Sequence, residues 1–370
     1  MYSYWESSYW FDNYDFVVIG AGIVGLSTAI ELRTKFSEAK ILVLERGHLP
    51  TGASTKNAGF ACFGTISEIS DDLSVLSDQE VIDLIKLRWK GLSILKDRIP
   101  AAKMDMRNYG GYEMFIDQVG HEKYLTQLQH INALIENAIG HKDVIQNIGQ
   151  KFSQKLYENC FFNRFESQLN PVLLMRFLLN QCNSQNIEIK FSAKVRNFER
   201  KVGQWDVYLD DSLIVNSKKL VLCTNAFSNN ILENLDIVPY RNQVIISKPI
   251  EHLQLKGTFH FNKGYTYFRN IDNRLLIGGA RNIDMKMEQT DQFGANDKII
   301  KYLVAFANEY LLLKPMEIER TWSGIIATGQ TKNVLLRKEN EDLYIGLRLG
   351  GMGVAIGSAV AKELVELIDL

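Results

Sequence analysis

The chain has 370 residues, of which 46% are hydrophobic and 11% aromatic, enough for a sizeable core, so disorder is excluded. This length exceeds one core of ordinary size, and two closely joined domains are expected. The net charge of −1, with lysine and arginine scattered along the chain, argues against a nucleic-acid-binding surface and an electrostatic membrane anchor.

Cysteines and histidines show no metal-binding or disulfide spacing. Cys62, Cys160, Cys182 and Cys223 form no CxxC pair, so we expect reduced, mostly buried thiols of a cytoplasmic protein. The six histidines form neither HxH nor HExxH, and the sequence therefore predicts no metal site. The start of the chain does not resemble a signal peptide, and no run of about eighteen apolar residues could span a bilayer. We expect a soluble, cytoplasmic, globular protein.

The strongest local pattern lies near the N-terminus. Residues 14–19 are a β-branched, apolar strand, followed by the glycine turn 20–25 and an apolar helix to about residue 36. Residues 40–45 form a second buried strand with an acid at its end. Strand, turn, helix and strand within about thirty residues predict a βαβ unit.

Further elements follow in chain order. Small residues at 51–59 predict a loop that exposes its backbone. Helices are predicted over 78–98, over 122–138, and from Pro171 to about 182. The first of these helices should end before Pro100. Strands are predicted at 187–191, 194–199, 205–209, 220–223 and 343–346. Alternating apolar and polar residues over 239–281 predict an antiparallel sheet. A final turn is predicted at 350–353, and a helix follows it over 354–368.

The order of these elements predicts an α/β fold. Parallel βα segments near the start, middle and end suggest a Rossmann-type domain, a mostly parallel sheet with helices, assembled from residues 1–95, 150–238 and 320–370. Residues 96–149 and 239–319 would form a substrate-binding domain on a mostly antiparallel sheet.

The glycine turn predicts dinucleotide binding. Gly20 permits a tight turn, Gly22 lets a pyrophosphate approach the backbone, and Gly25 allows close helix–strand packing. The helix from Ile23 would direct its positive end at that pyrophosphate. Glu45 ends the second strand, where it could accept hydrogen bonds from a ribose diol, which disfavours NADP. A tight turn that merely packs against a helix is the alternative.

Two further backbone-exposing segments favour FAD over NAD. These are residues 52–59 and 350–353, which could contact a large, stationary cofactor from distant parts of the chain.

The sequence also resembles a known family, that of FAD-dependent amine and amino-acid oxidoreductases such as D-amino acid oxidase, glycine oxidase and sarcosine oxidase. The matching stretches span nearly the whole chain in the family's order: 15–26 with Glu45, 52–54, 57–59, Asn170-Pro171 with Val195, 220–226, 267–269, 276–279, 322–324 and 350–354.

This resemblance implies non-covalent FAD binding by named residues. The ribose and pyrophosphate would be held by Gly20, Gly22, Ile23, Gly25, Glu45, Arg46 and Ser54. Lys56, Asn57, Ala58 and Gly59 would lie along the flavin ring. Val195 would contact the adenine, and Thr224 would end a strand beside the cofactor. Gly350, Gly351, Gly353 and Val354 would approach the isoalloxazine.

The sequence departs from the family where relatives grip a carboxylate or activate oxygen. Ile326 replaces the arginine after Trp-x-Gly, Ala355 replaces a lysine, and Leu276 occupies the position of the oxygen-activating lysine. Ala327-Thr328 resembles relatives that act on polyamine derivatives. An α-amino acid substrate and O2 as acceptor are therefore both in question.

Four residues remain as candidates for contacting the substrate: Arg348, Tyr267, Arg269 and Tyr265. Arg348 precedes the Gly350 turn, but a structural salt bridge is an equal alternative. Tyr267 and Arg269 lie in an alternating strand and could face solvent instead. Cys62 is expected to be a buried small residue, because the flavin-linking cysteine of sarcosine oxidases has no counterpart here.

The predicted activity is FAD-dependent oxidation of the C–N bond of a small amine or amino acid, by hydride transfer to the flavin, with hydrolysis of the imine that forms. The electron acceptor is O2 or unknown. Two alternatives stay open: an FAD dehydrogenase that passes electrons to a quinone or protein, and a non-catalytic flavin-binding subunit.

Overall fold

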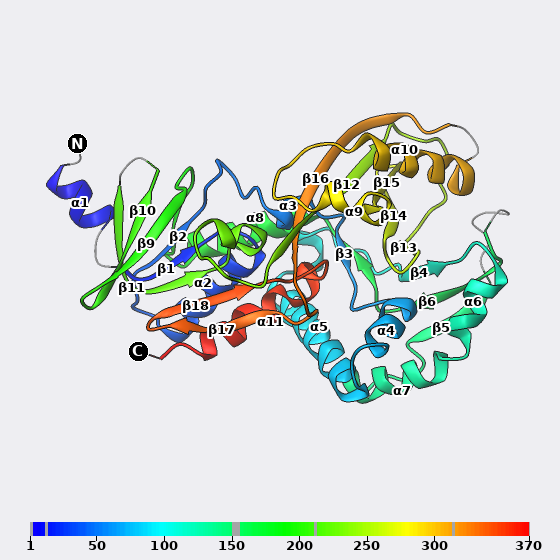
Figure 1. The fold of residues 1–370 in the computed structure, drawn as a ribbon, viewed down its shortest axis with the longest axis horizontal. Helices are drawn as coiled ribbons and strands as arrows, with labels where there is room; N and C mark the ends of the chain where they lie inside the picture. Colours follow the sequence, from blue (N-terminus) through cyan, green and yellow to red (C-terminus); the bar gives the residue numbers. More distant parts are fainter. Residues whose placement is uncertain (1–2, 12–13, 150–155, 211–212, 313–314, 370) are drawn as a thin grey trace. The chain divides into compact units, whose positions relative to one another are not determined.

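The computed structural model describes residues 3–11, 14–149, 156–210, 213–312 and 315–369. The chain divides into two compact units. The first unit comprises Met1–Thr55, Val172–Tyr240 and Ile325–Leu370, and the second comprises Lys56–Pro171 and Arg241–Gly324. The strands of each unit can be followed by their labels in Figure 1.

The first unit is built on an eight-stranded sheet. Its parallel strands lie in the order β18 (Leu343–Leu347), β11 (Ile214–Leu222), β1 (Tyr14–Ile19), β2 (Ile41–Leu44) and β8 (Glu188–Lys190). Antiparallel pairs add β17 (Leu335–Asn340) to β18, and β10 (Gln204–Leu209) and β9 (Val195–Lys201) to β11.

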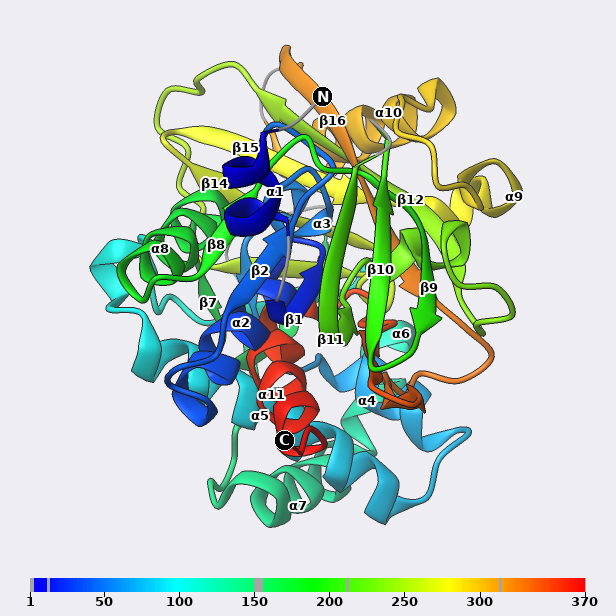
Figure 2. The same ribbon diagram turned by 90° about the vertical axis from the view of Figure 1, so that its left-hand side faces the viewer.

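Helices cover this sheet because its central strands are apolar on both faces. All residues of β2 and β18 are buried. The principal helices are α2 (Ile23–Lys35), α8 (Pro171–Ser184) and α11 (Gly353–Glu366), and α11 packs against α2 (Figure 2). The other helices among the described residues of this unit are short: α1 (Tyr4–Trp10), α3 (Ala53–Lys56), which ends one residue into the second unit, and η2 (Asn225–Asn230).

The second unit is built on another eight-stranded sheet. Its order is β16 (Ile318–Thr328), β12 (Val238–Ser247), β15 (Arg274–Gly279), β14 (Thr266–Ile271), β13 (Thr258–Phe261), β4 (Gly111–Met114), β6 (Asn159–Asn163) and β5 (Ile145–Gly149). The β13–β4 pair is parallel, and the β12–β15, β14–β15, β13–β14, β4–β6 and β5–β6 pairs are antiparallel. A separate ribbon joins β3 (Phe60–Ala61) to β7 (Ser167–Gln168).

Local sequence signals define the helices of the second unit. The Ser77 side chain accepts a hydrogen bond from Glu80 N, and this capping box begins α5 (Asp78–Arg98), which ends before Pro100. A second capping box, from Thr65 to Glu68, begins α4 (Ile66–Leu73). The remaining helices are α6 (Gln118–Leu125), α7 (Leu128–Ile139), α9 (Met285–Glu288), α10 (Asp297–Phe306) and the short η1 (Ala101–Lys103), η3 (Arg281–Ile283) and η4 (Ala307–Leu311).

The two faces of the second sheet differ in character. On one face, Phe259, Phe261 and Phe268 pack with Leu303 and Phe306 of α10 in an apolar core. Side chains alternate along a strand, so residues such as Thr258 and His260 point to the other face. That face is buried as well, although it carries polar and charged groups.

The predicted fold class is confirmed: a unit with a largely parallel, helix-covered sheet is joined to a unit with a mostly antiparallel sheet. The unit boundaries differ from those predicted, because 56–95, 150–171 and 320–324 belong to the second unit and 239–240 to the first. Their strands β3, β6 and β7 and helix α5 pair or pack there. Helical periodicity alone could not reveal which domain these segments join.

The helix predicted over 122–138 is wrong in one respect, because two helices, α6 and α7, occupy this stretch. The break follows Leu125, where the Thr126 hydroxyl donates to the Lys123 carbonyl and so satisfies a free acceptor at the end of α6. Among the described residues, no helix is long and apolar enough to cross a membrane.

Candidate FAD site and substrate-binding residues

The turn after β1 requires glycine at two positions. Gly20 has φ +106°, and a Cβ there would lie 2.8 Å from the Cys223 carbonyl oxygen. A Cβ on Gly25 would lie 1.8 Å from the Gly20 carbonyl oxygen, so α2 could not approach the turn as closely. Both residues therefore serve the tight strand–turn–helix geometry from which a dinucleotide-binding turn is built.

The N-terminus of α2 is open to an anion. Its N-cap residue is Gly22, which provides no side-chain cap. The N–H of Ile23 donates to Ser54 Oγ at 2.9 Å, which brings Ser54 of the short helix α3 to the start of α2. Free backbone N–H groups and the helix dipole favour negative charge at this point.

Glu45 lies beside the same turn and is 6% exposed. Its Oε2 accepts a hydrogen bond from Ala21 N at 3.1 Å, and its Oε1 accepts one from Gly47 N at 3.0 Å. The carboxylate therefore connects the glycine turn to the segment after β2. Each of its oxygens keeps acceptor capacity, so a ribose diol could still donate to it. The guanidinium of Arg46 lies over the Phe227 ring at 3.7 Å.

Two other predicted FAD residues lie at strand ends of the first unit. Val195 is the first residue of β9 and is 7% exposed. Thr224 follows β11, and its backbone N would lie 3.5 Å from a Cβ on Gly20, so it borders the glycine turn directly. Its hydroxyl forms a hydrogen bond of 2.8 Å with Ser228 Oγ.

The turn before α11 leaves its backbone uncovered. Gly350 has φ +57°, and a Cβ on Gly350 or Gly351 would meet no atom within 4 Å. The N-cap of α11 is Met352, whose side chain makes no capping hydrogen bond, and Gly353 begins the helix. Val354 is partly buried in its first turn. The segment thus combines open backbone with a helix N-terminus.

These features fit FAD. A pyrophosphate and ribose require a helix end whose N-cap is glycine, two glycines whose Cβ atoms would collide with backbone, and a buried carboxylate beside them, and all of these are present. The glycines before α11, which face open space, could likewise admit a flat ring close to the backbone.

The segment Lys56 to Gly59 is held firmly within the second unit. Trp322 Nε1 donates to the Lys56 carbonyl at 2.9 Å, and Gly59 N donates to Asn57 Oδ1 at 2.8 Å. Gly59 has φ +75°, and its carbonyl accepts a hydrogen bond of 3.0 Å from Arg269 Nη1. The role of this loop beside a flavin ring stays a prediction.

Arg269 therefore helps to hold the segment from Lys56 to Gly59 in place. It is 4% exposed, and Nη1 also donates to the Leu169 carbonyl at 2.9 Å. Burial lowers its pKa to about 10, so the guanidinium remains charged near neutral pH. This geometry assigns the residue to positioning the chain around Gly59, although its Nε has no partner among the described residues.

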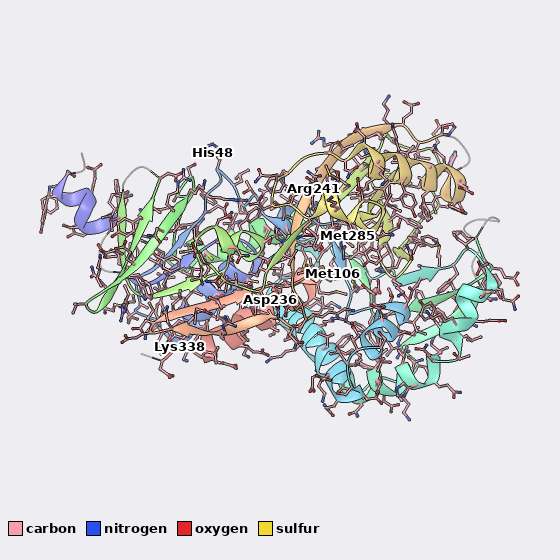
Figure 3. All side chains as sticks on the ribbon, viewed as in Figure 1. His48, Met106, Asp236, Arg241, Met285 and Lys338 are labelled. Atoms are coloured by element: carbon pink, nitrogen blue, oxygen red, sulfur yellow. The ribbon has the colours of Figure 1, made fainter. Side chains whose placement is uncertain are left out.

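Arg348 lies in a closed network of the first unit. Its guanidinium is bound to the Asp236 carboxylate, and it also donates to Asn333 O at 2.7 Å and Thr331 Oγ1 at 3.0 Å. Asp236 is labelled in Figure 3. The Arg348 side chain is 6% exposed. The structural alternative for this residue is favoured over the substrate contact.

The two tyrosine candidates differ in their surroundings. Tyr265 precedes β14 and lies under the Arg281 guanidinium at 4.9 Å. Tyr267 lies within β14, with its ring against Phe60 at 5.6 Å. Within the described residues its hydroxyl makes no hydrogen bond. Burial raises the pKa of Tyr267 to about 12, so this hydroxyl is a neutral donor at working pH.

Sequence reasoning missed a residue that shapes the turn before α11. Asn225, with φ +48°, accepts hydrogen bonds at Oδ1 from Arg348 N at 3.0 Å and Leu349 N at 3.4 Å. It also missed Asp236, the partner of Arg348. Asn225 follows Thr224 in a matched stretch, so a short polar residue able to adopt positive φ was the available signal.

Comparisons with known proteins agree with this geometry. Residues 15–367 match the family described as FAD dependent oxidoreductase, DAO. The probable oxidoreductase OrdL of Haemophilus influenzae is 22% identical, over 96% of this chain and 83% of that protein. The crystal structure of L-proline dehydrogenase from P. horikoshii is 18% identical with a TM-score of 0.78, covering 96% of this chain and 93% of that one. Glycine oxidase from Geobacillus kaustophilus is 15% identical with a TM-score of 0.76, covering 96% and 94%.

The two solved structures show that the fold is shared, and the family match covers almost the whole sequence. The expected family and cofactor are thereby confirmed: this chain belongs to the DAO family of FAD-dependent oxidoreductases.

Proposed function

We propose that this flavoenzyme oxidises the C–N bond of a small amine or amino acid. The observation that carries the proposal is the shared fold, over 96% of the chain, with enzymes named L-proline dehydrogenase and glycine oxidase. Iminodiacetate oxidase from Chelativorans has the same fold, with a TM-score of 0.75. All three names denote substrates with a C–H bond next to an amine nitrogen.

FAD, when bound, supplies a hydride acceptor for the carbon next to that nitrogen. The protein then has to align the substrate and keep water away from it. This chemistry needs no acid–base pair if the amine binds in its neutral form. In the first unit, the α2 N-terminus with Gly22, Ser54 and Glu45 would hold the pyrophosphate and ribose.

An apolar cluster of the second unit suits the hydrocarbon part of such a substrate. It is formed by Ala58, Val244 and Leu276 with the partly buried Phe60, Ile246, Tyr267, Ile271 and Trp322. Leu276, which stands where relatives carry an oxygen-activating lysine, is 5% exposed in this cluster. Tyr267 offers a hydroxyl without a described partner, and we assign to it the contact with the substrate's polar end.

Arg348 and Arg269 receive structural roles in this proposal. Both guanidinium groups are at least 94% buried and donate to protein carbonyls or to Asp236. An α-carboxylate would therefore have to be held by other donors. This favours an amine whose second polar group is uncharged, in accordance with Ile326 at the position of the carboxylate-binding arginine.

The acceptor stays open between O2 and a quinone or protein, and an apolar Leu276 favours the dehydrogenase alternative. The four free, buried cysteines support the expected reducing, cytoplasmic compartment. FAD is proposed to bind non-covalently, because the flavin-linking cysteine of sarcosine oxidases has no counterpart here, and acid precipitation should then release it entirely into the supernatant.

The activity is tested by anaerobic mixing of the purified holoenzyme with a panel of primary and secondary amines and amino acids. Bleaching of the flavin absorbance by at least one amine is expected. Re-oxidation by O2 with peroxide formation would identify an oxidase, and re-oxidation only by a dye or quinone would identify a dehydrogenase. If no amine or amino acid bleaches the flavin, the proposal is wrong and the flavin-binding subunit is favoured.

A further inference from the structure

Three potential metal ligands converge inside the second unit, and the proposed chemistry does not use them. These are the Cys62 thiol, the Glu166 carboxylate and the His260 imidazole, and their ligand atoms all lie within 4.8 Å of one another. The three residues are 9%, 1% and 5% exposed. From this geometry we propose that Cys62, Glu166 and His260 bind one Zn2+ ion.

The strand pairing explains why Cys62 and Glu166 meet. In the β3–β7 ribbon, Phe60 pairs with Gln168 and Ala61 with Ser167. Continuing this antiparallel register by one residue places Cys62 opposite Glu166. A residue pair directly opposite in such a ribbon has Cβ atoms about 4.5–5.5 Å apart, a separation that two ligands of one metal ion can share.

His260 comes from a different element. It lies on β13, on the face of the sheet opposite the phenylalanine core, and its Nε2 is 2.9 Å from Glu166 Oε2. Two ligand atoms on a tetrahedral zinc ion are separated by about 3.4 Å, since each lies about 2.1 Å from the metal. Zinc binding therefore requires these two atoms to move apart by only about half an ångström.

The surroundings of Glu166 are shaped to admit and orient its carboxylate. A Cβ on Gly111 would lie 2.1 Å from Glu166 Oε2, so a glycine is required there. Thr258 Oγ1 donates to the same oxygen at 2.7 Å. Such hydrogen bonds to a ligating carboxylate fix its orientation, as in established metal sites. The Phe60 ring lies edge-on to His260 at 5.3 Å and restricts the imidazole further.

The donor set selects zinc. A thiolate with an imidazole and a carboxylate combines soft and borderline ligands, which Zn2+ accepts and which Mg2+ or Ca2+ does not. With a thiolate, a carboxylate and a neutral imidazole, the zinc complex is electrically neutral, so its burial costs little. Three protein ligands leave a fourth position, which a water molecule would occupy.

The ion would stabilise a weak part of the second unit. The β3–β7 ribbon has two residues in each strand, which is too short to be stable alone. Zinc would tie this ribbon to β13 and thereby also stabilise the chain at Gly59, which directly precedes β3. The sequence predicts no metal site, because these ligands are about a hundred residues apart from one another and spacing motifs detect only ligands that are close in sequence.

The test begins with elemental analysis of the FAD-containing protein, expressed with zinc in the medium and dialysed against metal-free buffer. About one zinc ion per bound FAD is expected. Cys62→Ala and His260→Ala should each lose the zinc, whereas Cys160→Ala, which removes a buried thiol on β6, should keep it. FAD content shows which variants are folded. A wild-type protein without zinc, or zinc retained in folded Cys62→Ala, overturns the proposal.

Wild-type protein alone provides a second measurement if the variants do not fold. X-ray absorption at the zinc edge should show one sulfur at about 2.3 Å and lighter ligands at about 2.0–2.2 Å. Replacement by Co2+ should give ligand-field bands at longer wavelengths than the flavin absorbs. A shell of oxygen and nitrogen atoms without sulfur contradicts the assignment. These readouts do not depend on activity, so they are separate from any failure of the amine screen.

Discussion

The Arg348 guanidinium is bound to the Asp236 carboxylate, with further hydrogen bonds to Asn333 O and Thr331 Oγ1. Arg348→Met should therefore lower the free energy of unfolding by about 2–3 kcal/mol, because a buried charge pair loses one member. The loss should be smaller than for a fully buried pair, since the Asp236 side chain keeps 35% exposure. Chemical denaturation of the two proteins measures the difference.

Arg337→Met is the matched control for this experiment. Arg337 pairs with Glu339 in the same unit, but its side chain is 50% exposed, and such a pair contributes at most about 1 kcal/mol. If Arg348→Met kept wild-type stability while the Michaelis constant for an identified substrate rose about tenfold, Arg348 would be a substrate contact after all.

Glu45 connects the glycine turn to the segment after β2 and is also assigned to the ribose. The variants Glu45→Ala and Glu45→Gln should therefore differ in their effects on stability and on FAD binding. Glu45→Ala should weaken FAD binding by about 1.5–3 kcal/mol, tenfold or more in Kd, and also lower the stability of the FAD-free protein. Glu45→Gln keeps one acceptor for Ala21 N or Gly47 N, so its FAD-free stability should fall less. Flavin-fluorescence titration and thermal unfolding measure the two effects. If both variants bind FAD as tightly as the wild type, Glu45 does not contact the ribose.

Gly351 tests whether a cofactor lies against the turn before α11. A Cβ there would meet no protein atom within 4 Å, so Gly351→Ala should leave the FAD-free protein as stable as wild type. If a flavin ring approaches this backbone, the same methyl group should weaken FAD binding at least tenfold. Gly149→Ala, whose Cβ would also have room, is the control and should change neither property. Unchanged FAD affinity in Gly351→Ala would place the flavin elsewhere.

Local patterns were sufficient for the parts of the structure that depend on neighbouring residues. The strand 14–19, the helix 78–98 and the glycine turn follow from periodicity, capping and backbone freedom within about thirty residues. The fold class followed from the order of these elements. The resemblance then identified the family and its cofactor, which the match over residues 15–367 confirms.

Side-chain partners distant in sequence could not be predicted in this way. For Arg348, a substrate contact and a structural salt bridge remained equal alternatives, because its partner Asp236 lies 112 residues away and no pattern links the two. Likewise Arg269, taken as an exposed or substrate-facing residue, donates to carbonyls 100 and 210 residues away. The same limit concealed the group of Cys62, Glu166 and His260.

Glu113 should make stability depend on pH. Burial raises the pKa of this carboxyl to about 7 from an ordinary value of 4.5, despite hydrogen bonds from Ser67. Because the folded-state pKa is raised, the contribution of the protonated Glu113 to the free energy of unfolding is fully present below pH 4.5. This contribution is lost as the pH rises through 7. The total loss is about 3 kcal/mol. Glu113→Gln removes this titration, so its stability relative to wild type should increase between pH 5 and 8 in urea unfolding. A difference that is constant across this range would show that Glu113 titrates normally.

Tyr267→Phe should weaken substrate binding and leave the stability of the protein almost unchanged. Its hydroxyl makes no hydrogen bond with the described residues, so Tyr267→Phe should change the free energy of unfolding by less than about 0.5 kcal/mol. Tyr14→Phe is the matched control, because the Tyr14 hydroxyl contacts Glu188 Oε2 at 2.7 Å and Trp10 O at 3.1 Å, and its removal should cost about 1–2 kcal/mol.

With an amine substrate identified by flavin bleaching, Tyr267→Phe should raise the Michaelis constant several-fold at unchanged FAD content, because one donor to the substrate's polar end is lost. The effect should persist from pH 7 to 10, since the raised pKa of about 12 keeps the hydroxyl protonated throughout. Wild-type kinetics in Tyr267→Phe would transfer the contact to Tyr265, whose ring lies under Arg281 at 4.9 Å. Tyr265→Phe, measured on the same substrate, would then have to show the loss.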